Sequence, residues 1–154
     1  MPVVISLRGH ALRKGRHSEP GRIYLLTTVV RARQPLFSDM TSARLLIQEL
    51  RLAHDCRLAS SLSWVVMPDH LHWLVQLGDS NLDSLMRQVK SRSAMAINRA
   101  RGVSGPLWQE GFHDRALRHD DDVLAAARYV VANPLRAGLV TRLGDYPFWD
   151  AVWL

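Results

Sequence analysis

The sequence has little of several things that would otherwise narrow its class. Among its 154 residues there is one cysteine, Cys56, so no intrachain disulfide and no thiolate zinc site can form. No apolar run approaches the roughly 18 residues that a membrane helix needs. The apolar run at residues 3–7 is too short for a signal-peptide core, and the basic residues follow it rather than precede it. These absences favour a cytoplasmic protein without a membrane partner.

Lysine is also scarce, because only two of the 20 basic residues are lysines and the rest are arginines. The formal net charge is +6 and the sequence pI is about 10.4. The planar fork of arginine suits phosphate contacts, so the charge favours a nucleic-acid partner over a membrane or an acidic metabolite. An arginine excess can also reflect a GC-rich genome alone. With 47% hydrophobic and 22% charged residues, the chain is otherwise typical of one globular domain.

The hydrophobic periodicity predicts an α+β fold. Strand patterns cover residues 22–30, 61–67, 70–77 and 112–118, and helical patterns cover residues 41–57, 81–101 and a last segment from 120–122 to Pro134. This order is β-α-β-β-α-β with one further helix, which predicts a ferredoxin-like arrangement with an antiparallel sheet. Residues 1–21 are basic and lack periodicity, so we expect an N-terminal arm before a single domain at residues 22–154.

Two histidines at alternate positions are the most informative feature of the chain. His70 and His72 lie in residues 67–75 (MPDHLHWLV), where Pro68 and Asp69 are expected to form a turn before a strand. Side chains at i and i+2 of a strand point the same way, so the two imidazoles would project side by side. Two neutral imidazoles that face one point make half of a site for a divalent metal. The alternative is a pair of surface histidines on a solvated face.

The last predicted helix carries Tyr129 and, four residues later, Asn133, which would share one helix face. A tyrosine hydroxyl is a nucleophile where nearby cations or a base offset its high pKa. Asn133 offers a neutral carbonyl oxygen, which is acceptable as a third ligand for a hard divalent cation. The alternatives are a core tyrosine with an exposed hydroxyl and an asparagine that only caps the helix.

Three separated blocks resemble the IS200-type single-tyrosine transposases, in particular the branch associated with repetitive extragenic palindromes (REP). The blocks are residues 67–75 (MPDHLHWLV), 107–115 (LWQEGFHDR) and 129–140 (YVVANPLRAGLV), and residues 21–29 (GRIYLLTTV) and 90–91 (KS) also fit. The resemblance covers residues 20–150 and leaves the first twenty residues and the tail at 148–154 without a confident alignment. His113 stands where an aromatic such as tyrosine is common in that branch.

The resemblance implies a role for each matching residue. His70 and His72 match the metal-binding histidines, Tyr129 matches the nucleophile, and Asn133 stands where this branch has a third metal ligand and the wider group typically uses glutamine. The implied activity is cleavage and rejoining of single-stranded DNA with Mg²⁺ or Mn²⁺, through a 5′-phosphotyrosine link and without a nucleotide cofactor. The implied partner is single-stranded and hairpin DNA, and a monomer is favoured over a dimer. The basic residues expected to contact DNA are Arg13, Lys14, Arg16, Arg22, Arg87, Lys90, Arg92, Arg115 and Arg118.

Three other functions compete with this interpretation. A domesticated relative that binds hairpins without cutting them would form no covalent protein–DNA adduct. A replication-initiator or relaxase-type endonuclease would share the paired histidines but lack the block at residues 133–138 (NPLRAG). A metal-dependent hydrolase of small molecules would need no basic arm and agrees poorly with the charge of +6.

Overall fold

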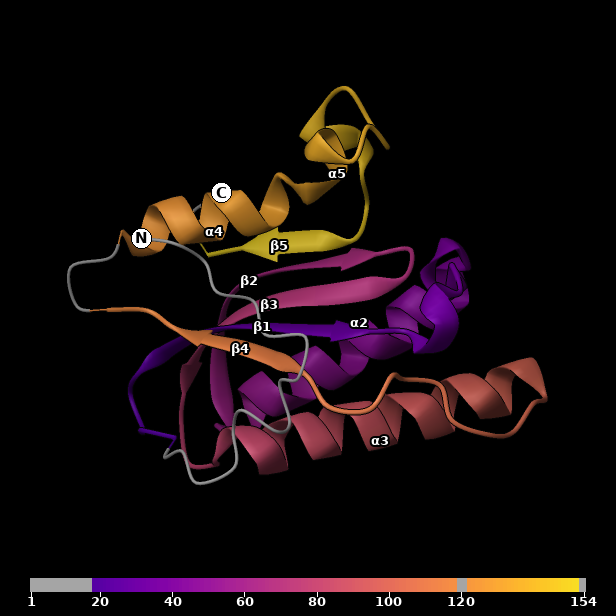
Figure 1. Cartoon of the computed structure of the whole chain (residues 1–154), viewed down its shortest axis with the longest axis horizontal. Helices are drawn as coiled ribbons and strands as arrows, with labels where there is room; N and C mark the ends of the chain where they lie inside the picture. The colour runs from indigo at the N-terminus through magenta and orange to yellow at the C-terminus, as the bar shows by residue number, and fades with distance from the viewer. Residues whose placement is uncertain (1–17, 119–121, 153–154) are drawn as a thin grey trace.

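The architecture is a five-stranded antiparallel sheet in the order β4-β1-β3-β2-β5, seen in a computed structural model that describes residues 18–118 and 122–152 (Figure 1). The strands are β1 (Ile23–Val29), β2 (Ala59–Met67), β3 (His70–Leu77), β4 (His113–Ala116) and β5 (Trp149–Ala151). The α-helices are α2 (Met40–Asp55), α3 (Leu82–Arg101), α4 (Val123–Val131) and α5 (Asn133–Arg136). Short 3-10 turns lie at Arg31–Arg33, Leu36–Ser38 and Leu143–Asp145. The predicted β-α-β-β-α-β order is confirmed.

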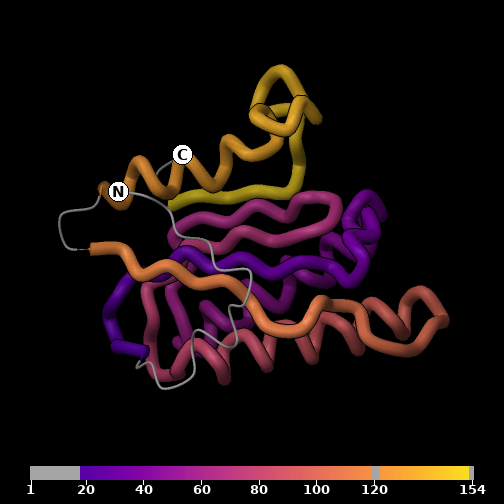
Figure 2. The backbone as a smooth tube through the Cα atoms, viewed as in Figure 1, coloured from indigo at the N-terminus to yellow at the C-terminus, as the bar shows by residue number. Residues whose placement is uncertain are grey.

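The two sides of the sheet are covered unequally. Helices α2 and α3 lie on one side, and the shorter α4 lies on the other side, close to β5 (Figures 1 and 2). The larger hydrophobic cluster includes Leu71, Trp73 and Val75 of β3 together with buried residues of α2 and α3. The smaller cluster includes Leu74 of β3 and packs against α4. Because strand side chains alternate, His70 and His72 share the α4 side with Leu74.

The helix ends follow the capping residues in the sequence. Asp39, Asn81 and Asp122 each accept a hydrogen bond from a backbone N–H in the first turn of α2, α3 and α4. Gly102 ends α3 with a φ of 67°, in the left-handed region that glycine adopts without strain. The residue types at Asn81 and Gly102 thus account for both ends of α3.

Several predicted boundaries differ from the structure. Helix α2 stops at Asp55, since Arg57 has a φ of 61° and cannot continue a right-handed helix. The strand expected at 112–118 is only His113–Ala116. Strand β2 begins two residues earlier than predicted, at Ala59. The tail supplies β5, which the sequence did not predict because a three-residue strand has no measurable periodicity.

The prediction of one helix that runs to Pro134 was wrong. Helix α4 ends at Val131, and Asn133 opens the separate helix α5 with Pro134 in its first turn. Proline is tolerated there because the N–H that it lacks has no intrahelical partner in the first turn. Pro134 therefore starts a short helix instead of closing a long one.

The hairpin of β2 and β3 contains a bulge. The pairing register shifts between Ser61 and Ser63, so that Ser61 pairs with Val75 and Ser63 pairs with Leu74. The two serines consequently face opposite sides of the sheet although they are two residues apart. On its side, Ser61 Oγ accepts a hydrogen bond from Trp73 Nε1 at 2.8 Å.

The described part of the expected arm is attached to the domain. Gly21 donates its backbone N–H to Leu77 at 2.7 Å and accepts from Gln76 Nε2 at 2.9 Å, and Ser18 Oγ accepts from Leu82 N at 3.1 Å. The rest of the expected arm, residues 1–17, lies outside the described residues. None of the described helices is both long and apolar enough to cross a membrane.

Candidate functional site

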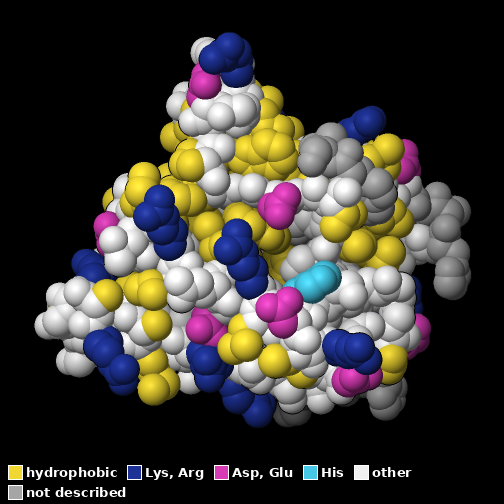
Figure 3. All heavy atoms as spheres, turned by 180° about the vertical axis from the view of Figure 1, so that it is seen from behind, with side chains coloured by type: hydrophobic (Ala, Val, Ile, Leu, Met, Phe, Trp, Pro, Cys, Tyr) yellow, Lys and Arg dark blue, Asp and Glu magenta, His cyan; other side chains and the backbone are white. Residues whose placement is uncertain are grey.

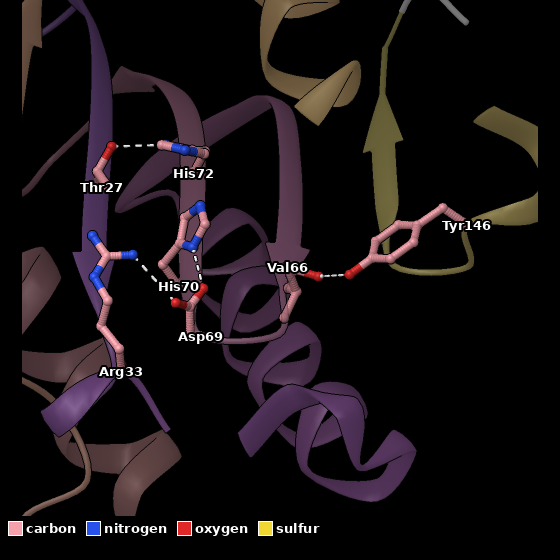
Figure 4. A network of polar contacts seen from close by, with 7 residues as sticks. All are labelled: Thr27, Arg33, Val66, Asp69, His70, His72 and Tyr146. Carbon is pink, nitrogen blue, oxygen red and sulfur yellow. Dashed lines mark hydrogen bonds and ion pairs between the residues drawn. The ribbon is translucent and has the colours of Figure 1, made fainter. Parts of the chain in front are cut away.

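The two motif histidines lie next to each other on β3, as the alternation predicts. Their ring centroids are 4.7 Å apart and the rings meet edge to face, with an interplanar angle of 82°. Figure 4 shows the two imidazoles one above the other along the strand. The pair is partly buried, so the prediction of two side chains that project side by side is confirmed and a fully solvated pair is not what the structure has.

Each imidazole is held through its Nδ1 atom by a different neighbour. His70 Nδ1 donates to Asp69 Oδ1 at 2.6 Å, and Asp69 in turn accepts from Arg33 Nη1 at 3.2 Å (Figure 4). His72 Nδ1 is hydrogen-bonded at 2.8 Å to Oγ1 of Thr27, the residue opposite it on β1. When Nδ1 carries the proton, Nε2 presents its lone pair, which is the usual arrangement of a metal-binding histidine and its supporting partner. In that tautomer both rings leave Nε2 available to a ligand.

The electrostatics keep His72 neutral. Burial, and then the charges of His70 and Arg136, lower the pKa of His72 to about 3. Burial alone would raise the pKa of Asp69, but its hydrogen bond and charge interaction with His70, and those with Arg33, hold it below the usual range. At neutral pH the site thus presents a neutral imidazole ring in His72 beside an ionised Asp69.

Helix α4 packs on the same side of the sheet as these histidines. It contacts β2, β3 and β5, and its Ala127, Val130 and Val131 are buried in one cluster with Leu74. Tyr129 is on the outer side of this helix with 53% of its surface exposed. Tyr129 is therefore carried by a helix that packs on the histidine side of the sheet.

Arg136 contacts Tyr129 and acts electrostatically on His72. Its guanidinium lies over the Tyr129 ring at 3.9 Å from the centroid, and its Nη2 donates to the Tyr129 carbonyl at 2.6 Å. After burial and the charge of His70, the positive charge of Arg136 also lowers the pKa of His72. Arg136 is not among the residues predicted from the sequence, because its contacts with Tyr129 depend on the change of helix between α4 and α5.

Asn133 serves first as a cap at the break between α4 and α5. Pro134 has no N–H to give to the carbonyl of Val130, and Asn133 Nδ2 donates to that carbonyl at 3.1 Å instead. The capping alternative is therefore correct for the amide nitrogen. Its oxygen, the atom that would bind a hard cation, is the end that this bond does not use. The expectation that Tyr129 and Asn133 share one continuous helix was wrong, since the chain between them changes helix.

The donor set fits a divalent ion only with help from other oxygen atoms. Within residues 18–118 and 122–152, no three His, Cys, Asp or Glu side chains are grouped closely enough to hold a metal. His70 and His72 thus offer two nitrogen donors, and any further position would need an amide, water or substrate oxygen. Such a mixed set suits Mg²⁺ or Mn²⁺ when the substrate supplies phosphate oxygens.

The described basic residues expected to contact DNA differ in their surroundings. Lys90 Nζ donates to the carbonyls of Gln109 and Gly111 at 2.9 and 2.6 Å, and burial lowers its pKa to about 8. Arg92 is paired with Glu49 at 2.7 Å. These contacts tie α3 to its neighbours, and they give Lys90 and Arg92 structural roles that the sequence did not reveal.

The other predicted DNA contacts are spread over different places. Arg22 and Arg118 line one hollow of about 380 Å³ beside β1, and Arg87 lines a groove of about 490 Å³ between α3 and residues 106–112. Arg115 lies on β4, on the same side as the histidines. Figure 3 shows basic side chains separated by hydrophobic and uncharged ones on the face it draws. Arg13, Lys14 and Arg16 lie outside the described residues.

Comparison with known proteins defines the family. Residues 21–133 match the family described as "Transposase IS200 like", and the chain belongs to this family. The REP-associated tyrosine transposase of Escherichia coli (strain K12) is 32% identical over 88 residues, which are 56% of this chain and 50% of that protein. A Haemophilus influenzae relative is 27% identical over 94 residues, 54% of this chain and 53% of its own. The chain thus spans about half the length of the curated relatives that it matches.

Two solved structures have the same fold. One, a REP-associated tyrosine transposase bound to a REP hairpin, is 27% identical with a TM-score of 0.71, and the match covers 87% of this chain and 79% of that one. The other, a transposase structure from Deinococcus radiodurans R1, is 19% identical with a TM-score of 0.52 and covers 76% and 94% of the two chains. The second likeness concerns the fold alone.

Proposed function

We propose that this protein is a metal-dependent single-stranded DNA endonuclease and strand transferase that acts at palindromic hairpins through a 5′-phosphotyrosine intermediate. The observation that carries the proposal is the pair His70 and His72, each held through Nδ1 on the sheet face against which α4 packs. Membership of the IS200-like family supports it. Further support comes from relatives named tyrosine transposases, one of which is bound to a REP hairpin.

The metal would be Mg²⁺ or Mn²⁺, held by the Nε2 atoms of His70 and His72. The amide oxygen of Asn133 is the proposed third protein ligand, because the Val130 carbonyl uses its nitrogen. When bound, the ion neutralises charge on the scissile phosphate and orients it. Asp69 and Thr27 keep the two imidazoles in the tautomer and orientation that this requires.

Tyr129 is the proposed nucleophile. Its hydroxyl gives a proton to water and its oxygen attacks the phosphorus, so that a P–O bond to tyrosine forms while the P–O3′ bond breaks. The leaving oxygen takes up a proton and becomes a 3′ hydroxyl, and the DNA stays attached to Tyr129 through its 5′ phosphate. Attack by a 3′ hydroxyl on this link reverses the bond changes, which joins strands without a nucleotide cofactor.

Arg136 supplies positive charge beside the reacting atoms in this proposal. Its guanidinium is fixed by the Tyr129 ring and carbonyl, so its position costs little side-chain freedom at the moment of reaction. A fixed cation of this kind stabilises negative charge that develops on the phosphate and on the tyrosine oxygen. The same contact keeps Tyr129 and α5 together.

The test is the covalent adduct itself. The protein is incubated with Mn²⁺ and a labelled REP hairpin oligonucleotide with a single-stranded 5′ extension, and the mixture is run on a denaturing gel. Tyr129→Phe keeps the ring and its contact with Arg136 and removes only the oxygen. We expect the adduct and the cleaved product to disappear in Tyr129→Phe, while hairpin binding and the unfolding temperature stay near the wild-type values.

Tyr146→Phe is the matched control, because the Tyr146 hydroxyl is bonded to the Val66 carbonyl at 2.6 Å and belongs to the fold rather than the site. This variant should still form the adduct. A Tyr129→Phe protein that forms the adduct would refute the nucleophile assignment. Wild-type protein that binds the hairpin without any adduct would favour the domesticated, non-cleaving function instead.

A further inference from the structure

His113 lies on the same face of the sheet as the two site histidines. It opens the edge strand β4 and pairs with Thr27 of β1, which in turn pairs with His72 of β3. Residues directly opposite one another in neighbouring strands project to the same side. His72, Thr27 and His113 therefore form a row across three strands. Figure 1 shows β4 at the edge of the sheet, remote from β2 and β5, which α4 covers.

The hydrogen bonds of His113 set it apart from the other two histidines in this region. His70 and His72 each have a partner at Nδ1, whereas the Nδ1 atom of His113 is buried and has no hydrogen-bond partner among the described residues. No hydrogen bond holds the proton on Nδ1, so the proton can reside on Nε2, which is the atom that would donate to a ligand. Burial lowers the pKa of His113, against the opposing charge of Asp114. The neutral ring then has one donor and one acceptor to offer.

The width of the sheet separates His113 from the metal position. Neighbouring strands lie about 4.8 Å apart, so β4 and β3 are separated by roughly 10 Å with β1 between them. Among the residues that the structure describes, no third His, Cys, Asp or Glu side chain is grouped closely enough with His70 and His72 to hold a metal, so His113 is not part of that donor set. A ligand that contacts His113 would therefore be a part of the substrate that extends from the histidine pair on β3 across β1 to β4. Arg115, two residues farther along β4, projects from the same side and makes this path more positive.

We propose that His113 is a substrate-contacting residue that donates a hydrogen bond to the phosphodiester next to the one attacked by Tyr129. The single strand then crosses the sheet face from β3 over Thr27 to β4. This inference rests on the proposed function, because it takes single-stranded DNA as the ligand of the histidine face. It adds a contact between His113, on the edge strand β4, and a DNA phosphate, and so gives a role to a residue that the sequence alone did not explain.

The first experiment measures DNA binding separately from cleavage. In a Tyr129→Phe background, His113→Phe removes both ring nitrogens at similar size. It should weaken binding of the REP hairpin oligonucleotide with its 5′ extension about tenfold, as expected for one hydrogen bond to a charged group. His113→Gln keeps a donor near the Nε2 position and should restore most of the affinity. His54→Phe, on α2 at the opposite side of the sheet, is the matched control; it removes the hydrogen bond that His54 Nδ1 accepts from Ser61 N and should still bind like the parent protein.

The second experiment locates the contact on the DNA. Phosphates of the single-stranded extension are replaced one at a time by uncharged methylphosphonates. At one position the replacement should weaken binding about tenfold to the protein with His113 and have no further effect on His113→Phe, because that variant has already lost the bond. Equal sensitivity of the two proteins at every position would overturn the proposal.

Two other results would also overturn it. Loss of Mn²⁺ binding in His113→Phe, with an unchanged unfolding temperature, would make His113 part of the metal site. Absence of any binding of the oligonucleotide to the Tyr129→Phe protein would overturn this proposal and the proposed function together. Failure of wild-type protein to form the adduct would refute the cleavage mechanism alone, because the binding cycle at His113 does not depend on cleavage.

Discussion

On one side of strand β3, Leu71, Trp73 and Val75 are completely buried under α2 and α3. On the other side of the same strand, His70 and His72 are partly exposed and are held by hydrogen bonds rather than by close packing. Neighbouring residues in the sequence thus belong to different regions of the molecule. Because α2 and α3 stabilise the sheet from one side, the part of the other side beyond α4 can carry polar residues that are held by hydrogen bonds. Substitutions at adjacent positions of β3 should therefore affect either stability or metal binding, depending on the side to which the residue points.

The largest effect is expected on the histidine side. His72→Ala should lower Mn²⁺ affinity and adduct formation by more than about a hundredfold, since loss of a ligand exceeds the loss of its supporting partner. The free energy of unfolding should change by less than about 1 kcal/mol, because the ring is not part of the main core. Calorimetric Mn²⁺ titration and urea unfolding measure the two quantities. A protein that unfolds on this substitution yet still cuts DNA when folded would make His72 a structural residue.

At Leu71, the residue before His72, we expect a large loss of stability and no loss of metal affinity. Leu71→Ala should lower the free energy of unfolding by about 2–5 kcal/mol, because it opens a cavity in a fully buried cluster. The fraction that remains folded should bind Mn²⁺ with unchanged affinity, since Leu71 points away from the site. Urea unfolding followed by tryptophan fluorescence, with the metal titration at low temperature, gives both numbers. Equal loss of metal affinity in the Leu71 and His72 variants would contradict the division between the two sides.

A smaller effect on metal binding is expected at Asp69, which lies in the turn between β2 and β3 and holds the His70 ring. Asp69→Asn should weaken Mn²⁺ binding about 10- to 100-fold, because it removes the charge that holds the His70 ring. Asp79→Asn, in the exposed loop beyond the far end of β3, is the matched control and should have no effect. Metal titration of the two variants is the measurement. An unchanged affinity in Asp69→Asn would mean that the carboxylate only supports the turn.

The smallest effect concerns Tyr146, which connects the segment before β5 with the end of β2. Tyr146→Phe removes the bond to the Val66 carbonyl and should cost about 1–2 kcal/mol at neutral pH. Burial raises the pKa of Tyr146 to about 12. The folded pKa is above the unfolded value of about 10, so the contribution is complete below pH 10 and is lost as pH rises toward 12. Unfolding curves of both proteins should therefore converge at alkaline pH, and a constant difference would contradict this role.

The sequence predicted the main elements and the pair of histidines because both depend on local spacing. Alternation placed His70 and His72 on one face, and capping residues such as Asn81 and Asp122 marked helix ends. Contacts that depend on strand register could not be read in this way. Thr27 reaches His72 only because β1 and β3 pair with that register.

Local sequence also left two other features ambiguous. A proline such as Pro134 can end one helix or stand in the first turn of the next, and only the folded chain shows which of these it does. Lys90 and Arg92 count as positive charge in the sequence, whereas the fold uses them in contacts with Gln109, Gly111 and Glu49. Net charge therefore does not tell which basic residues are held in contacts within the fold.

The bulge at Leu62 bears on how this chain can change in length. Upstream of it, Ser61 and Ala59 face the large cluster, and downstream of it, Ser63 and Val65 face the histidine side. Leu62 is the extra residue of the bulge, so deleting it would place Ser61, opposite Val75, directly before Ser63, opposite Leu74, and would keep both sets of pairings. Deleting a residue away from the bulge would instead turn part of β2 to the wrong side of the sheet. A single-residue deletion should therefore be tolerated better at Leu62 than elsewhere in β2.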